Sequence, residues 1–272
     1  MSATSSTANA VVPRLSIGNL QVDAHTFASA LGAIEALVSA GKGGAVFTPN
    51  VDHVVKVEHD AELREAYAAA DLCLADGMPL VWASRLLSTR LPERVAGSDL
   101  VVPLLELAAR RGWGVYLLGG APGSPERAAV EASRLTGVRI AGTDAPVIDL
   151  SRPHEGDGTA ALVRVRAARP ELLLVGLGAP KQELWIHRHR VELAPTVAIG
   201  VGASIDFLAG RIPRAPQWMA QSGLEWAYRL AREPRRLARR YLLEDPEFLI
   251  ILARAIAARA SARATGTSGP RT

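Results

Sequence analysis

Five short segments of the chain carry residue types that could bind or transform a substrate. Four of them are polar, at 48–50, 76–77, 92–99 and 178–183, and the fifth is the glycine-rich segment 119–124. In the second segment, the carboxylate of Asp76 could remove a proton from an attacking hydroxyl as a general base. Alternatively, Asp76 caps a helix that begins near Pro79.

Thr48, Asn50 and Arg94 are the candidates for direct contact with a substrate. The side chains of Thr48 and Asn50 can bind hydroxyl groups or an acetamido group of a sugar, and the guanidinium of Arg94 can bind a phosphate. The alternatives are a turn that caps the helix from Asp52, and a solvated surface arginine. Residue types alone do not decide between substrate contact and these alternatives.

The other two segments could hold a phosphate group. Backbone amides at Gly119 and Gly120 can approach a phosphate at the start of a helix, although the segment matches neither GxGxxG nor a P-loop. Lys181 could offset diphosphate charge, and Gln182 could bind a sugar or a base edge. The alternatives are glycines required for steric reasons, and a solvated helix start in which Glu183 favours the helix dipole.

The elements that would position these residues alternate between strands and helices. This alternation predicts an α/β fold, with a mostly parallel, Rossmann-like sheet covered by helices on both faces, plus a helical, basic C-terminal appendage. Ligands of such sheets bind beyond the carboxyl ends of the strands, and polar turns follow the expected strands at 48–50, 76–77, 119–120, 178–182 and 202–204. A β pair is expected at 11–22, and helices are expected over 52–70 and over 98–111, the latter capped by Ser98 or Asp99. Strands are expected at 44–50, 71–75, 114–119, 138–142, 171–176 and 196–202.

Composition divides the 272 residues into four parts: a disordered leader at 1–13, a catalytic core at 14–210, an arginine-rich appendage at 211–260 and a disordered tail at 261–272. No stretch approaches the roughly 20 apolar residues of a membrane span, and the leader lacks the features of a signal peptide. A cytoplasmic location is therefore expected. The single cysteine, Cys73, lies in an apolar run and is expected to be a buried hydrophobe.

The appendage carries arginines three or four residues apart, a spacing that places them on one helix face. Together with neighbouring aromatic and apolar residues they suit an anionic membrane surface, although a charge run is more often a solvated face. Some of them could also complete a diphosphate site over Asp76. The candidates are Arg229, Arg232, Arg235, Arg236 and Arg239.

Several classes of protein fit poorly. The histidines have no metal-site spacing, and the chain has no Asp-x-Asp and no Gly-x-Ser-x-Gly. A nucleotide-dependent oxidoreductase would need a ribose-binding acid at a set distance after Gly119–Gly120, and none follows. A nucleic-acid-binding module would not need the apolar α/β core. No metal, cofactor or nucleic acid is therefore expected, and homo-oligomerisation is left open.

The order of the polar blocks resembles the WecG/TagA/CpsF glycosyltransferase family over roughly residues 14–245. The blocks are Thr-Pro-Asn-Val-Asp-His at 48–53, Ala-Asp-Gly-Met-Pro at 75–79, Arg-Val-Ala-Gly-Ser-Asp at 94–99, Gly-Leu-Gly-Ala-Pro-Lys-Gln-Glu at 176–183, Gly-Val-Gly-Ala-Ser-Ile-Asp-Phe at 200–207, Arg-Ala-Pro-Gln-Trp-Met at 214–219 and Gly-Leu-Glu-Trp-Ala-Tyr-Arg-Leu-Ala-Arg-Glu-Pro-Arg-Arg at 223–236. One departure stands at 203–206, where the family usually has an aromatic residue before the aspartate.

The resemblance implies an inverting, metal-independent transferase at the inner face of the cell membrane. It implies that a UDP-activated sugar, often N-acetylmannosamine or its uronic acid, is moved to a polyprenyl-diphosphate-linked N-acetylglucosamine in cell-surface polysaccharide synthesis. A related member would transfer another hexose or uronic acid to a longer lipid-linked oligosaccharide. By the same resemblance Asp76 is the base, Thr48 and Asn50 line the sugar pocket, and Arg94 and Gln182 contact substrate.

Overall fold

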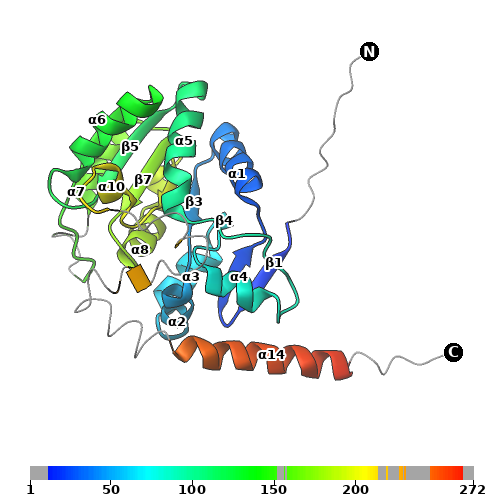
Figure 1. Cartoon of the computed structure of the whole chain (residues 1–272). Helices are drawn as coiled ribbons and strands as arrows, with labels where there is room; N and C mark the ends of the chain where they lie inside the picture. Colours follow the sequence, from blue (N-terminus) through cyan, green and yellow to red (C-terminus); the bar gives the residue numbers. More distant parts are fainter. Residues whose placement is uncertain are drawn as a thin grey trace, which may run out of the picture.

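The computed structural model describes residues 12–151, 156, 158–213, 219, 227, 228, 230 and 246–265. Strands and helices alternate through most of this chain, and Figure 1 shows them arranged in layers. The strands are β1 (Arg14–Ile17), β2 (Leu20–Asp23), β3 (Gly44–Phe47), β4 (Leu72–Cys73), β5 (Gly114–Gly119), β6 (Arg139–Asp144), β7 (Leu172–Gly176) and β8 (Val197–Gly200). The helices are α1 (Phe27–Ala40), α2 (Val51–His59), α3 (Ala61–Ala68), α4 (Met78–Ser84), α5 (Gly97–Arg111), α6 (Ser124–Thr136), α7 (Thr159–Ala168), α8 (Lys181–Arg188), α9 (Arg190–Leu193), α10 (Ser204–Leu208) and α14 (Glu247–Thr265).

The central sheet has the order β4-β3-β8-β7-β5-β6, and its described pairings are all parallel. β1 and β2 form a separate antiparallel hairpin, which is joined to β4 where the Cys73 amide donates to Asp23 Oδ2 at 2.7 Å. The predicted α/β fold with a parallel sheet is therefore confirmed. Cys73 is buried as expected, and burial raises the pKa of its thiol.

Both faces of the sheet are covered, because neighbouring strand residues point into different cores. Val46 belongs to a core formed with residues of α1, α5, α6 and α10, whereas Phe47 belongs to a second core formed with residues of the hairpin, α2, α3 and α8. Continuous apolar strands are typical of parallel sheets buried on both sides. Helix α14 lies beneath α2 in Figure 1 and adds Phe248 and Ile251 to the second core.

Three local expectations differ from the structure. The single helix expected over 52–70 is two helices, because Asp60 ends α2 and caps α3 by accepting from the Leu63 amide at 3.0 Å. Helix α5, expected to be capped by Ser98 or Asp99, has Ala96 at its N-cap and no side-chain cap. Helix α14 continues to Thr265, into the segment expected to be disordered.

Candidate functional site

Two strand-end turns, at 48–50 and 75–77, lie side by side with the loop 94–96 that precedes α5. The Asp76 amide donates to the Pro49 carbonyl at 2.8 Å, and the Val95 amide donates to the Ala75 carbonyl at the same distance. A Cβ atom on Gly77 would lie 3.8 Å from the Cβ of Asn50. Because β3 and β4 are neighbours, the turns that follow them share one edge of the sheet, where ligands of open α/β sheets bind.

Asp76 and Arg94 form the charged part of this edge. Arg94 Nη1 lies 3.7 Å from Asp76 Oδ1, and the same guanidinium pairs with Asp99. The Arg94 side chain is only 12% exposed, so the alternative of a solvated surface arginine is wrong. The N-cap of α4 is Gly77 and not Asp76, so the capping alternative for Asp76 is also wrong. The site thus has a carboxylate and a largely enclosed cation in direct contact.

Thr48 and Asn50 lie on the neighbouring strand end and are held in place by hydrogen bonds. The buried Thr48 hydroxyl donates to the Gly200 carbonyl of β8 at 3.1 Å. Gly97 packs so closely on Thr48 that a Cβ there would lie 2.9 Å from the hydroxyl oxygen. Asn50 caps α2, because its Oδ1 accepts from the Asp52 amide at 3.1 Å. The capping reading of this turn is therefore confirmed for Asn50, and the cap fixes its side chain beside Asp76.

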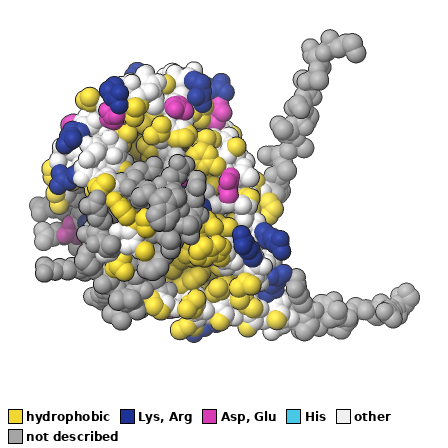
Figure 2. Space-filling model, in the orientation of Figure 1, with side chains coloured by type: hydrophobic (Ala, Val, Ile, Leu, Met, Phe, Trp, Pro, Cys, Tyr) yellow, Lys and Arg dark blue, Asp and Glu magenta, His cyan; other side chains and the backbone are white. Residues whose placement is uncertain are grey.

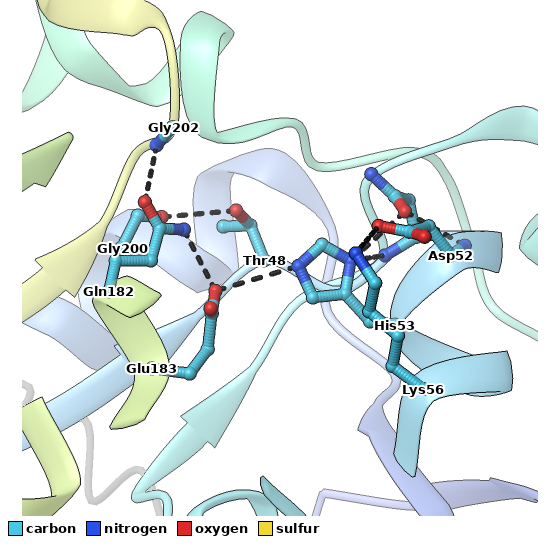
Figure 3. A network of polar contacts seen from close by, with 9 residues as sticks. Thr48, Asp52, His53, Lys56, Gln182, Glu183, Gly200 and Gly202 are labelled. Atoms are coloured by element: carbon cyan, nitrogen blue, oxygen red, sulfur yellow. Dashed lines mark hydrogen bonds and ion pairs between the residues drawn. The ribbon is translucent and has the colours of Figure 1, made fainter. Parts of the chain in front are cut away.

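Gln182 and Glu183 are buried, so the alternative of a solvated helix start is wrong. Figure 3 shows the Gln182 amide between two partners: Nε2 donates to Glu183 Oε1 at 2.8 Å, and Oε1 accepts from the Gly202 amide at 3.0 Å. Gln182 therefore links α8 to the turn after β8. Its predicted contact with substrate stays a prediction.

His53 and Tyr67 belong to the same buried region, and their place in it was not predicted. His53 Nε2 lies 3.5 Å from Glu183 Oε1, and the rings of His53 and Tyr67 meet edge to face at 6.1 Å. Burial, followed by the negative charge of Glu183, raises the pKa of the Tyr67 hydroxyl. In the sequence, the position of His53 three residues after Asn50 was the available signal, since N-cap and N3 side chains interact.

The glycine turn at Gly119 and Gly120 lies away from the turn of Thr48 and Asn50, which follows β3. β5, which precedes it, is three strands from β3, or about 14 Å at the usual strand spacing. The Gly120 amide donates to the Gly176 carbonyl at 2.9 Å, and the next amide, of Ala121, donates to Asp206 Oδ1 at 3.0 Å. Two amides of the turn are thus used within the protein, which supports the steric reading of the glycines. The predicted phosphate contact stays a prediction.

Gly119 itself shows the steric reason clearly. It has φ +101°, and a Cβ there would lie 2.6 Å from the Gly176 carbonyl. We expect Gly119→Ala to lower the free energy of unfolding by about 1–3 kcal/mol more than Gly112→Ala, because overpacking adds to the backbone strain. Gly112 is a matched control, with φ +70° and open space around it. Urea denaturation measures both variants, and equal losses would contradict the close-approach explanation.

The remaining predicted residues lie elsewhere. Lys181 is exposed, and its Nζ donates to the Ile148 carbonyl at 3.0 Å in the loop after β6. The appendage arginines Arg229, Arg232, Arg235, Arg236 and Arg239 lie outside the described residues. In the part of the chain that the structure describes, no cluster of three metal-binding side chains occurs. Within the same ranges, no helix combines the length and apolar character needed to cross a membrane.

Comparison with known proteins agrees with the order of the sequence blocks. The model of the glycosyl transferase WecG/TagA/CpsF family matches residues 15–262. The N-acetylglucosaminyldiphosphoundecaprenol N-acetyl-beta-D-mannosaminyltransferase of Bacillus subtilis (strain 168) is 30% identical over 209 residues, covering 76% of this chain and 78% of the relative. The protein of the same name from Bacillus spizizenii (strain ATCC 23059 / NRRL B-14472 / W23) is 30% identical over 226 residues, covering 83% of this chain and 84% of the relative.

Proposed function

Since this chain belongs to the WecG/TagA/CpsF family and is therefore a glycosyltransferase, we propose that it transfers a sugar from a UDP-sugar to a polyprenyl-diphosphate-linked N-acetylglucosamine. The donor that fits best is UDP-N-acetylmannosamine, because both relatives carry N-acetylmannosaminyltransferase in their names. The product would serve cell-surface polysaccharide synthesis. A member that transfers another hexose or a uronic acid to a longer lipid-linked acceptor is the second candidate.

The contact between Asp76 and Arg94, beside Asn50, is the observation that carries this proposal. In an inverting transfer, the acceptor hydroxyl attacks the anomeric carbon on the face opposite the leaving UDP. Asp76 would take the hydroxyl proton as the new bond forms. The guanidinium of Arg94 carries a fixed positive charge and a planar fork of N–H donors, the type of group that binds phosphate oxygens. Charge on the diphosphate would then be stabilised without a metal ion.

The test uses a panel of UDP-sugars with a short polyprenyl-diphosphate-N-acetylglucosamine analogue. We expect UDP release that requires both substrates and is fastest with UDP-N-acetylmannosamine. The anomeric configuration of the product, read by NMR, tests inversion, and unchanged rates in EDTA test metal independence. If UDP release does not depend on the acceptor analogue, the proposed reaction is wrong. Faster release with a uronic acid or another hexose would favour the second candidate.

An exposed apolar surface supports a peripheral membrane position. Figure 2 shows hydrophobic side chains gathered at the lower right of the molecule, where Figure 1 places α4 and α14. Helix α14 packs on the core through Phe248 and Ile251, yet its other side is also largely apolar. Apolar residues on all sides of a helix indicate that another phase or molecule covers it. The exposed apolar residues of this α4–α14 surface are Trp82, Leu86, Leu249, Ile250 and Ile256.

The α4–α14 surface begins close to the candidate base. Helix α4 starts at Met78, two residues after Asp76. Arg259 of α14 donates to the Leu86 carbonyl at 2.7 Å, which joins α14 to the segment that follows α4. Exposed Arg85 and Arg254 belong to the same helical segments. Apolar residues beside arginines suit the surface of an anionic membrane. A lipid-linked acceptor lying in such a membrane would then be near Asp76.

Replacing Leu86, Leu249 and Ile250 with glutamine is expected to weaken binding to vesicles of anionic phosphatidylglycerol by roughly 100-fold. Each apolar side chain that enters the membrane surface is expected to contribute about 1 kcal/mol to the binding free energy. Sedimentation with the vesicles measures the effect. The control replaces Val163 and Val191, which are also exposed but lie on α7 and α9, with glutamine. The α4–α14 surface is not the docking surface if the control and the triple variant sediment alike.

A further inference from the structure

Glu183 is a buried carboxylate with no assigned role. Its side chain is 1% exposed, and it lies in the core that contains Phe47, Tyr67 and Trp185. Removing a carboxylate from water costs several kcal/mol unless close partners compensate for the loss. The partners of Glu183 should therefore explain why a carboxylate is buried here.

One link from Glu183 leads to the turn after β8. Glu183 Oε1 accepts from Gln182 Nε2 at 2.8 Å, which leaves the Gln182 Oε1 atom directed at the Gly202 amide, 3.0 Å away. An amide side chain has distinct donor and acceptor ends, so a partner at one end fixes the orientation of the other. Glu183 thus determines which end of Gln182 meets the turn.

The other link leads to Asn50 through His53. His53 Nε2 faces Glu183 Oε1 at 3.5 Å (Figure 3). Its Nδ1 lies 3.2 Å from the Asn50 amide nitrogen and 3.0 Å from Asn50 Oδ1. A neutral imidazole has one donor and one acceptor nitrogen. The charge of a carboxylate beside Nε2 favours the proton there, so Nδ1 accepts from the Asn50 amide. The approach of Nδ1 to Asn50 Oδ1, which accepts from the Asp52 amide, is then a contact and not a hydrogen bond. Glu183 thus selects the tautomer that completes the capping box of α2.

Stability alone explains this arrangement poorly. Glu183 Oε2, His53 Nε2 and the Tyr67 hydroxyl are buried and have no hydrogen-bond partner among the residues that the structure describes. A buried ionic group with incomplete hydrogen bonding is often less stable than apolar residues of similar volume. The carboxylate is better explained by the two turns that it orients than by a contribution to folding.

We propose that Glu183 is a positioning residue of the transfer reaction: through His53 it holds the Asn50 turn, which lies beside the turn of Asp76, and through Gln182 it holds the Gly202 turn at the neighbouring strand end. This inference rests on the proposed function for its kinetic effect but not for its structural one. Glu183 does not touch the substrate. Its effect reaches the donor sugar through Asn50.

The kinetic test compares Glu183→Leu and Glu183→Gln with the wild-type enzyme. We expect Glu183→Leu to keep or raise the Tm and to raise the KM for the UDP-sugar about tenfold, with a smaller change in kcat. Glu183→Gln, which can still accept from Gln182, is expected to have a KM between those of the wild type and Glu183→Leu. In an Asn50→Ala background, Glu183→Leu should have little further effect on KM. Glu192→Gln, an exposed carboxylate on α9, is the control for loss of charge.

A second measurement does not depend on the reaction. Long-range ¹H–¹⁵N NMR spectra report the tautomer of His53 and should show the Nε2–H form in the wild type and a mixture in Glu183→Leu. An unchanged tautomer in Glu183→Leu overturns the proposal even if the proposed transfer is wrong. The proposal is also overturned if Glu183→Leu raises KM as much in the Asn50→Ala background as in the wild-type background. It is overturned as well if the activity of Glu183→Leu falls only in proportion to its Tm. Absence of transfer by the wild type, with the expected tautomer change, would reject the proposed function alone.

Discussion

Asp76→Asn is expected to lower turnover by roughly 10²-fold or more while leaving folding and UDP binding nearly intact, because an amide cannot take the proton of the acceptor hydroxyl. Asparagine has the size of aspartate, and the backbone bond from residue 76 to the Pro49 carbonyl does not involve the side chain. Initial rates of acceptor-dependent UDP release measure turnover. Thermal unfolding and calorimetric titration with UDP measure the two properties that should not change.

The matched control for this variant is Asp144→Asn. Asp144 is the last residue of β6, and like Asp76 it pairs with an arginine, since Arg164 Nε donates to its Oδ2 at 2.7 Å. It belongs to β6, at the opposite edge of the sheet from β4. Loss of the Asp144 carboxylate, on the outermost strand farthest from β4, should leave turnover within about twofold of wild type. Near-normal turnover in Asp76→Asn, or an equal loss in Asp144→Asn, excludes Asp76 as the base.

The sequence predicts the fold well because its signals are local. Apolar runs of four to six residues separated by helical segments indicate a parallel sheet, and polar turns after those runs indicate the edge that binds ligand. The order of the strands depends on contacts between distant segments, which such runs do not specify. Thus Asp76, Arg94 and Asn50 lie together as expected, whereas Gly119–Gly120 follows a strand three positions away from β3.

Residues whose partners are distant were the hardest to predict. Glu183 appears from the sequence as a charge at a helix start, but His53, 130 positions earlier, lies beside it in a buried layer. Likewise, the accepting partner of the Ala121 amide is Asp206, which no local pattern around the glycine turn indicates. The exposure of Arg94 was left open by the sequence, because its enclosure depends on the neighbouring turns and on helix α5.

Arg94→Ala is expected to lower kcat/KM by about 10²–10³-fold, the range found when one donor to a developing charge is removed. The loss should be large because the guanidinium is nearly enclosed and contacts Asp76. Arg94→Lys should recover little, since a lysine ammonium cannot reproduce the planar fork that spans two acceptors. Steady-state kinetics with varied UDP-sugar, together with Tm, measure both variants. The change in stability should stay below roughly 1 kcal/mol, because Asp76 and Asp99 are each about 30% exposed.

The double variant of Arg94→Ala with Asp76→Asn separates two roles of this arginine. If Arg94 only orients the Asp76 carboxylate, its removal will cost little once Asp76 is asparagine. If it also binds the diphosphate, a loss of about tenfold or more will remain, and the affinity for UDP will fall in both backgrounds. Arg164→Ala, which breaks the Asp144 pair, controls for loss of a strand-end ion pair. If the activity of Arg94→Ala lies within about threefold of wild type, Arg94 does not belong to the active site. The cation that binds the diphosphate near Asp76 would then have to come from another part of the chain.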